Sequence, residues 1–571
     1  MATRLLTAAE ALFLTCLVVA PWPYGCAPEA ATFALSAVLS LAGALVAAAW
    51  ALEGRGLPPL ARPVAALLVL GPVQIAFGIS AARVWTGEAT LILAAMLGVA
   101  VFWGRRGSEP AAGWRLATAV LLTCGAQAVF GAVQWQLAPD RIYGQASEFL
   151  TTPFGSYVNH NHFAGLLGMG VAVALGCALG LLRRAGGPTP AALCLFGLGL
   201  GLLAAHLASR SRGGLLSLLG GLAGLVLLLS LVPSRRRGRA RSRLTIGLLT
   251  LAGVLGFGLL AIPESARLHL TSLLGGAHDS SGQYRLDVAR GTLRLALSHP
   301  LLGSGLGAYA DAFPRLKLAH GEVRTTHAES DVLEFLAESG LLGLALVGWL
   351  SVLAFRGLRD RLTHGRDPAR KGLALAAAAA CLTLGIHSLL DFNLRLPANA
   401  LVFASLLGLA AAPRSAPRSW GGTKTAGAAT AVCLLFAVLS AYRAWGALTL
   451  DAARAQADPH ARIAALTRTV GRHPYLADAY RERALAWRSL ALKRRAAQPR
   501  LDKAGQDLER ALALRPSWGE VWAELGWVRA LAGDVPGARR AFDRAIEADP
   551  SHRHVVRARA DFLKRLEPTA R

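Results

Sequence analysis

Apolar runs of about 20 residues recur along the chain from its start to about residue 446, and this repetition constrains the fold more than any other feature. A helix of that length spans the hydrocarbon core of a lipid bilayer. Hydrophobic residues make up 54% of the 571 residues and charged residues only 16%, which excludes an ordinary soluble protein. The sequence predicts an all-α, polytopic membrane protein.

We expect about thirteen transmembrane helices, counted from the runs of spanning length. They cover residues 5–22, 31–52, 63–80, 88–104, 114–137, 161–182, 190–208, 213–232, 244–262, 341–356, 372–390, 397–412 and 425–446. The first run is expected to remain as a span, because no small-residue cleavage site followed by a soluble domain comes after it. Residues 1–446 form the predicted membrane domain, which a large polar insert interrupts at 263–340.

Positive charge is distributed unevenly between the two faces of this domain. Many arginines fall in every second loop, such as the run SRRRGRARSR at 234–243, and contribute to the net charge of +26. Because positively charged loops stay in the cytoplasm, these loops and the N-terminus are predicted to be cytoplasmic. The insert and the other polar turns then share the opposite face. This distribution explains the positive net charge without a nucleic-acid partner, and the sequence has no recognition module for nucleic acid.

From about residue 447 the chain becomes charged and alanine-rich, as is typical of soluble helices. The block 516–550 matches the 34-residue tetratricopeptide pattern at Trp522, Leu525, Gly526, Ala538 and Phe542. We predict a tetratricopeptide-repeat domain at 447–571, an α-solenoid that either binds a protein partner or only packs on the membrane domain. An odd number of spans places it on the face of the insert, whereas one span more or fewer would move it to the cytoplasm.

The insert carries two segments with chemically useful side chains. An amphipathic helix in GQYRLDVARGTLRLALSHP has Arg285 near its start. Further on, Thr326 and Glu329 have the spacing of a capping box, which would place His327 in the first turn of a helix. The positive end of a helix disfavours a charged imidazole, so we predict a neutral His327 that can accept a proton.

Carboxylates follow His327 at helical spacing. Asp331, Glu334 and Glu338 share one face of the predicted helix. We interpret Asp331 and Glu334 as a solvated face and keep Glu338 as a site candidate. The buried side of the helix is predicted to consist of Val332, Leu333 and Leu336.

Three other polar groups interrupt the apolar runs on the same face. The NHNH run contains Asn161, and its two histidines do not point one way on a helix, so we expect no metal site. The SRSRGG turn contains Arg210 and Arg212, and its glycines allow close backbone approach, so that the Arg212 guanidinium is expected to reach an anion. The HSLLDFNLRLP turn contains Asp391 and Asn393. The alternative for these groups is an ordinary polar interface with snorkelling arginines.

These motifs together resemble the family of O-antigen ligases and O-antigen polymerases, over roughly residues 150–412. The resemblance rests on the order PFGSYVNHNHFAG, SRSRGG, YRLDVARGTLRLALSHPLLGSGLGAYADAF, THAESDVLEFLAESGLLG and HSLLDFNLRLPANA. The family's essential histidine matches His327, and its two essential arginines match Arg212 and Arg285. Ala328 is a departure, because family members often have asparagine at that place.

The resemblance implies a glycosyltransferase in the bacterial inner membrane that uses no metal or other cofactor. Its periplasmic site would move a glycan from undecaprenyl diphosphate to an acceptor hydroxyl, with inversion at the anomeric carbon. Arginines suit the diphosphate leaving group, and His327 suits the removal of the hydroxyl proton. We count five residues as substrate-binding candidates, namely Asn161, Arg210, Glu338, Asp391 and Asn393.

Several alternatives stay open from the sequence. The acceptor is a lipid core or a protein in a ligase, and another lipid-linked glycan in a polymerase. A flippase for a polysaccharide or lipid would also be polytopic and basic, but its ionisable residues would line a passage within the spans. A non-catalytic membrane scaffold that displays the repeats would explain the C-terminal region but not Arg212, Arg285 and His327.

Overall fold

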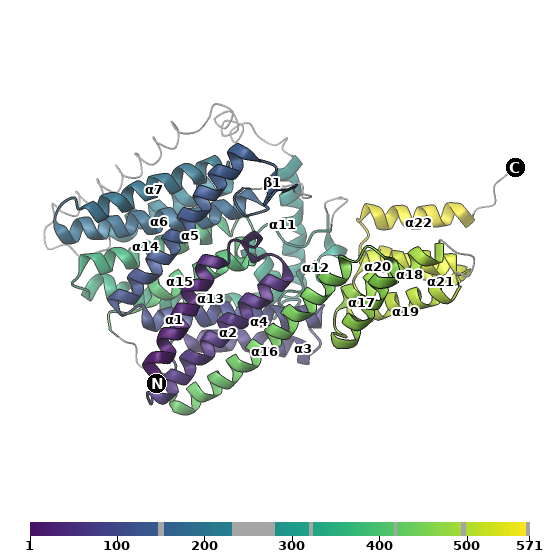
Figure 1. The fold of residues 1–571 in the computed structure, drawn as a ribbon, viewed down its shortest axis with the longest axis horizontal. Coiled ribbons are helices and arrows are strands. Elements are labelled where there is room, and N and C mark those ends of the chain that lie inside the picture. The colour runs from purple at the N-terminus through teal and green to yellow at the C-terminus, as the bar shows by residue number, and fades with distance from the viewer. Residues whose placement is uncertain (147–153, 231–279, 319–323, 416–418, 493–497, 567–571) are drawn as a thin grey trace.

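The computed structural model describes residues 1–146, 154–230, 280–318, 324–415, 419–492 and 498–566 (Figure 1). These residues form helices joined by short connections. Within the described ranges, the strands are limited to an antiparallel pair of two residues each, β1 (Arg141–Ile142) and β2 (Gln145–Ala146). The structure agrees with the predicted all-α class.

Ten helices in the described part of the chain are long and apolar enough to cross a membrane. They are α1 (Ala2–Val19), α2 (Glu29–Leu52), α4 (Arg83–Arg106), α5 (Pro110–Leu137), α6 (His160–Ala185), α7 (Pro190–Ala208), α8 (Arg212–Ser230), α13 (Asp331–His364), α14 (Pro368–His387) and α16 (Thr423–Arg454). Two shorter apolar helices accompany them, α3 (Ala61–Ala76) and α15 (Pro397–Ala411). Each of these helices overlaps a predicted span, which supports a polytopic membrane protein. The predicted span at 244–262 lies outside the described residues, so the exact number of spans stays a prediction.

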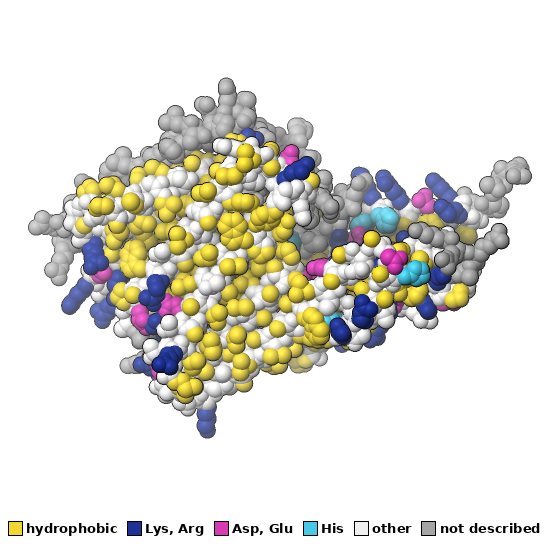
Figure 2. Space-filling model, viewed as in Figure 1, with side chains coloured by type: hydrophobic (Ala, Val, Ile, Leu, Met, Phe, Trp, Pro, Cys, Tyr) yellow, Lys and Arg dark blue, Asp and Glu magenta, His cyan; other side chains and the backbone are white. Residues whose placement is uncertain are grey.

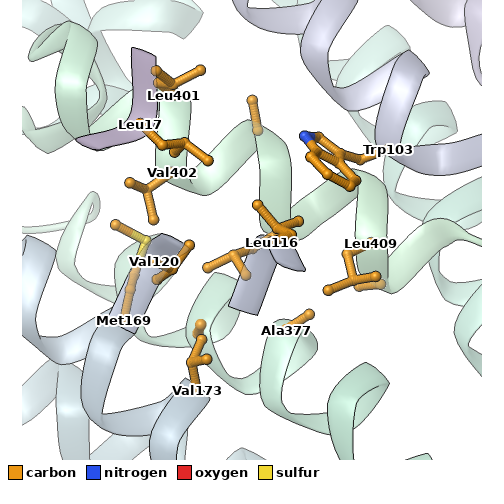
Figure 3. Packing of buried hydrophobic residues seen from close by; sticks show 14 of the residues in the cluster. Leu17, Trp103, Leu116, Val120, Met169, Val173, Ala377, Leu401, Val402 and Leu409 are labelled. Carbon is orange, nitrogen blue, oxygen red and sulfur yellow. The ribbon is translucent and has the colours of Figure 1, made fainter. Parts of the chain in front are cut away.

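Helix α6 forms the centre of the bundle, with 83% of its most apolar stretch buried. Small residues let the neighbouring α14 approach it closely: a Cβ atom built on Gly176 of α6 would lie 2.6 Å from the Cα atom of Ala376. Close packing of small residues is typical of helices that associate within a membrane. Larger side chains fill the space towards the other helices, among them Leu116, Val120 and Met169 (Figure 3).

The surface of the molecule divides into two regions of different composition. Hydrophobic side chains cover most of the visible face of the bundle, with charged side chains at its lower left edge, whereas charged side chains of both signs are spread over the C-terminal helices (Figure 2). Helix α16 joins the two regions: it packs along α2 and runs without a break to Arg454. The division agrees with a bundle that faces lipid and a C-terminal region that faces water.

The insert packs against α13 through α11 (Ser280–Ser298) and α12 (Tyr309–Ala312), and the 3₁₀ helix η2 (Pro314–Leu316) packs on these two helices. Helix α13 is interrupted at Gly340, whose φ of 63° and ψ of −166° are not helical. There Leu341 and Leu342 donate backbone hydrogen bonds to the carbonyls of Pro300 and Leu301. A side chain at residue 340 would collide with the Leu301 carbonyl, so the break requires glycine. The insert is thereby fixed to α13.

Among the described residues of the C-terminal region, six helices follow α16, and successive helices pack on one another. They are α17 (Pro459–Arg472), α18 (Ala477–Leu492), α19 (Gln498–Leu514), α20 (Gly519–Leu531), α21 (Val535–Ala548) and α22 (Arg553–Leu566). Gly526 of α20 faces the ring of Phe542 of α21, since a Cβ atom there would lie 2.8 Å from it. The pairing of α20 and α21 agrees with the predicted helices of 516–550. Their assignment to the tetratricopeptide family stays a prediction.

Candidate active site

The motifs singled out in the sequence meet around the turn between α14 and α15, residues 388–396. This turn includes the 3₁₀ helix η3 (Asn393–Arg395). It contacts the start of α6, the start of α11, the segment 324–330 and the first turns of α13. Four stretches that are far apart in the sequence are therefore close neighbours in space.

His327 lies before helix α13, in a non-helical segment. The N-cap of α13 is Ser330, whose hydroxyl oxygen accepts a hydrogen bond from the Leu333 amide at 3.4 Å. The predicted capping box of Thr326 and Glu329 is therefore wrong. Glu329 points instead to Arg285, with 3.5 Å between its carboxylate and the guanidinium, and it has a φ of 56°.

The protonation of His327 depends on a carboxylate and not on a helix end. Its Nδ1 atom lies 3.1 Å from Oε1 of Glu334, and its ring stacks on Phe392 at 4.5 Å. Burial favours the neutral form, but the Glu334 carboxylate outweighs burial and raises the pKa of His327 above its ordinary value. The prediction that a helix end keeps His327 neutral is wrong. Because Glu334 accepts a hydrogen bond from Nδ1–H, Nε2 is the atom that can take up a proton.

Glu334 and Glu338 form a buried ion-pair network with Arg395. The Nε atom of Arg395 lies 3.1 Å from Glu334 and its Nη2 atom 2.6 Å from Glu338. The network also receives backbone donors, since the Ala328 amide donates to Glu334 at 2.8 Å and the Tyr309 amide to Glu338 at 3.2 Å. Both carboxylates are almost fully buried. The same donors thereby fix the segment that contains His327 and the start of α12.

The burial pattern of α13 differs from the predicted one, although Leu333 and Leu336 of its predicted buried side are half-buried. Asp331 and Glu334 were expected to be solvated, but both are buried, while Val332 of the predicted buried side is 38% exposed. Asp331 accepts a hydrogen bond from the Leu394 amide at 2.8 Å. In a membrane the apolar face of a helix turns to lipid and the charged face turns inward, where it finds partners. Arg395 is the partner that the sequence analysis missed.

Asp391 and Asn393 hold the turn against α6. Oδ1 of Asp391 lies 3.2 Å from Nε2 of His162, and it accepts the Phe392 amide at 2.7 Å. Burial alone would raise the pKa of Asp391, but the contact with His162 and neighbouring cationic groups lower it to about 2. The Asn393 side chain is fully buried and accepts a hydrogen bond from Asn399 at 3.0 Å. Both side chains therefore bind other groups of the protein and support the turn.

The two arginines that match the family belong to different helices, and Arg285 contacts the same turn. Arg285 donates to the Leu390 carbonyl at 3.3 Å, and 40% of its side chain is exposed. Arg212 is the first residue of α8 and is half-buried, whereas Arg210 is exposed in the preceding turn. Between these two, the Ser211 hydroxyl donates to Oδ1 of Asn161 at 2.7 Å, which ties the turn to α6.

His387 is a buried histidine beside Gly213, the residue that follows Arg212. A Cβ atom built on Gly213 would lie 3.4 Å from Nε2 of His387, which ends helix α14 directly before the turn. Within the described residues, neither ring nitrogen of His387 has a hydrogen-bond partner. Arg285, His327 and the backbone next to Arg212 therefore all lie close to residues 387–392, as a shared site requires.

The described ranges contain no group of three His, Cys, Asp or Glu side chains that could hold a metal ion. The positively charged and hydrogen-bonding groups present, three arginines and a histidine next to carboxylates, suit a phosphorylated substrate and proton transfer.

A known protein family matches part of the chain that forms this site. Residues 197–348 match the family model described as O-antigen ligase. The matched stretch includes Arg212, Arg285, His327 and the carboxylates of α13, and it ends before the 388–396 turn. No curated protein shows significant similarity to the chain. The match supports the O-antigen ligase family and a membrane glycosyltransferase type of enzyme.

Proposed function

We propose that this protein transfers a glycan from undecaprenyl diphosphate to an acceptor hydroxyl, at the periplasmic face of the bacterial inner membrane. The observation that carries the proposal is the position of His327. Glu334 and Phe392 hold its ring, and Arg285 reaches the neighbouring residues of the same turn. The match to the O-antigen ligase model over 197–348 supports the substrate class.

In the proposed reaction His327 is the general base. Nε2 takes the proton from the acceptor hydroxyl as its oxygen attacks the anomeric carbon. The bond between that carbon and the diphosphate oxygen breaks, and the diphosphate leaves with the electron pair. Glu334 stabilises the imidazolium that forms, through the hydrogen bond at Nδ1. Such a base contributes about 10²- to 10⁴-fold to the rate. A single displacement inverts the anomeric configuration.

The arginines stabilise the charge that develops on the leaving diphosphate. A guanidinium binds phosphate oxygens with two parallel hydrogen bonds, which one ammonium group cannot reproduce. Arg285 has a water-exposed ion pair with Glu329 at 3.5 Å, a long contact that a diphosphate can replace. Arg212 begins α8, so the positive end of that helix adds to its charge. Arg210 lies beside it on the surface and would meet the same substrate.

Arg395 is a positioning residue in this proposal. Its single guanidinium pairs with both Glu334 and Glu338 in the interior, so that Glu334 can face His327 without an unpaired buried charge. His162 and Asp391 support Phe392 from the other side, and the Phe392 ring lies 4.8 Å from His162.

Transfer and transport can be distinguished with purified protein in lipid nanodiscs. With a glycan-loaded undecaprenyl diphosphate and an acceptor, the proposal predicts release of free undecaprenyl diphosphate. A flippase would move the donor across a vesicle membrane without releasing the diphosphate, and a scaffold would do neither. Absence of release with every acceptor class offered, whether lipid-linked glycan, lipid core or protein, would contradict the proposal. The acceptor that supports release separates ligase from polymerase.

A further inference from the structure

One buried carboxylate, Asp311 of α12, joins the C-terminal helices to the insert, where α21 also packs against η2. Its Oδ1 atom accepts hydrogen bonds from Arg515 Nε and from the Ser517 hydroxyl, each at 2.7 Å. Both donors belong to the connection between α19 and α20. A third donor comes from the insert itself, since Nη2 of Arg324 lies 2.9 Å from the same oxygen. Three segments of the chain therefore meet at one atom.

The contact is shielded from water and extends to the membrane bundle. Only 1% of the Asp311 side chain and 11% of the Arg515 side chain are exposed. The Arg515 guanidinium lies 5.3 Å from the ring of Trp85 in α4 and 4.6 Å from that of Trp518. In Figure 1 the C-terminal helices lie beside α11 and α12 at this end of the bundle. Arg515 thus joins the bundle, the insert and the C-terminal helices.

Asp311 is linked to the candidate site along two short paths. Two residues before it, the Tyr309 amide donates to Glu338, and the Tyr309 hydroxyl contacts Thr292 of α11 at 2.8 Å. On the second path, Arg324 also donates from Nε to the Ala310 carbonyl at 3.2 Å and lies three residues before His327. One carboxylate therefore anchors the segment that leads to His327 and the segment that contacts Glu338.

We propose that the C-terminal helices hold the His327 segment in place for transfer, with Arg515 and Ser517 as positioning residues. The inference rests on the proposed function for its catalytic consequence. The physical reason is the shielding of Asp311: without Arg515 the contact opens to water, and an exposed ion pair between Asp311 and Arg324 holds its segment far more weakly than a shielded one. The C-terminal region is then an integral part of the active enzyme.

Hydrogen exchange of the full-length protein in nanodiscs tests this directly. The Ala328 amide is a reporter, because it donates to Glu334 at 2.8 Å. We expect Arg515→Gln to speed exchange in the peptide that contains Ala328 by about 10-fold or more, since the opening of that segment becomes easier. Arg515→Lys keeps the charge and should restore part of the protection. Arg510→Gln, an exposed position on α19, is the matched control and should change nothing.

Kinetics provide the second readout. Arg515→Gln is expected to lower kcat by up to about 10²-fold, the effect of a small misplacement of a reacting group, while KM for the donor stays within a few-fold. A contact that only attaches the C-terminal helices would leave both kcat and the exchange of Ala328 unchanged. If Arg515→Gln does not fold, Ser517→Ala removes one donor and should show the same pattern with a smaller amplitude.

Unchanged exchange at Ala328 in the folded variants overturns the inference, even if the wild-type protein is an active transferase. Conversely, a wild-type protein that releases no undecaprenyl diphosphate contradicts the proposed function, while faster exchange at Ala328 in Arg515→Gln would still establish the mechanical link. The two proposals therefore fail separately.

Discussion

Replacing Glu334 by glutamine should slow transfer and move its pH dependence. The carboxylate makes one hydrogen bond to His327 at 3.1 Å, which becomes a bond between opposite charges when His327 takes up the acceptor's proton. A hydrogen bond to a charged group contributes about 1.5 to 3 kcal/mol. Loss of that contribution in the transition state corresponds to a fall in kcat of about 10- to 150-fold.

The sign of the pH effect follows from the same contact. Glu334 raises the pKa of His327, so neutral glutamine should lower that pKa. A general base works in its neutral form, and turnover therefore falls as the pH drops below its pKa. In Glu334→Gln this acidic decline should begin at a lower pH than in the wild type, although the maximum rate is reduced.

The assay is release of undecaprenyl diphosphate in nanodiscs, measured across the pH range for wild type and variants. Glu338→Gln is the matched control, because it also disturbs the ion pairs of Arg395 but leaves the bond between Glu334 and His327 in place. It should affect stability more than the position of the acidic decline. A Glu334→Gln variant with kcat within about threefold of wild type and an unchanged decline would refute the role given to Glu334.

Three further predictions use other parts of the molecule. Arg212→Lys and Arg285→Lys should each lower kcat/KM by about 10-fold or more, because an ammonium group cannot bind the diphosphate in two places; full activity in both would reduce the arginines to interface anchors. Gly340→Ala should lower the thermal unfolding temperature, because a side chain at a φ of 63° costs about 1 to 3 kcal/mol of backbone strain. Gly348→Ala, which places its methyl group in open space on the same helix, should leave that temperature unchanged. A reporter that is active only in the cytoplasm should stay inactive when fused after Arg571, and its activity there would contradict the periplasmic placement of the C-terminal helices.

The helices of the bundle could be predicted because each is a long apolar run, and length alone separates such runs from soluble helices. Helix α13 shows where this reasoning ends. Its apolar residues and its carboxylates have clear helical spacing, but the rule that apolar residues face inward holds for water and not for lipid. With Val332 turned outward, Asp331 and Glu334 face the interior.

The details of the site could not be predicted for a related reason. The pairing of Arg395 with Glu334 and Glu338 joins residues on two helices, and local spacing within one helix does not reveal it. Charges inside a membrane protein pair with one another. When one turn of the membrane domain carries an arginine between apolar residues and another helix carries carboxylates, the sequence therefore indicates an ion pair between them. The N-cap at Ser330 was missed because Thr326 and Glu329 offered an equally good local pattern.

The most direct test of the central claim is the turnover of His327→Gln. Glutamine preserves a hydrogen-bonding side chain but cannot accept the acceptor's proton as a base. With donor binding and turnover measured on the same purified protein, we predict normal affinity for glycan-loaded undecaprenyl diphosphate and a fall in turnover of about 10²- to 10⁴-fold. Turnover within a few-fold of wild type would contradict the assignment of His327 as the general base.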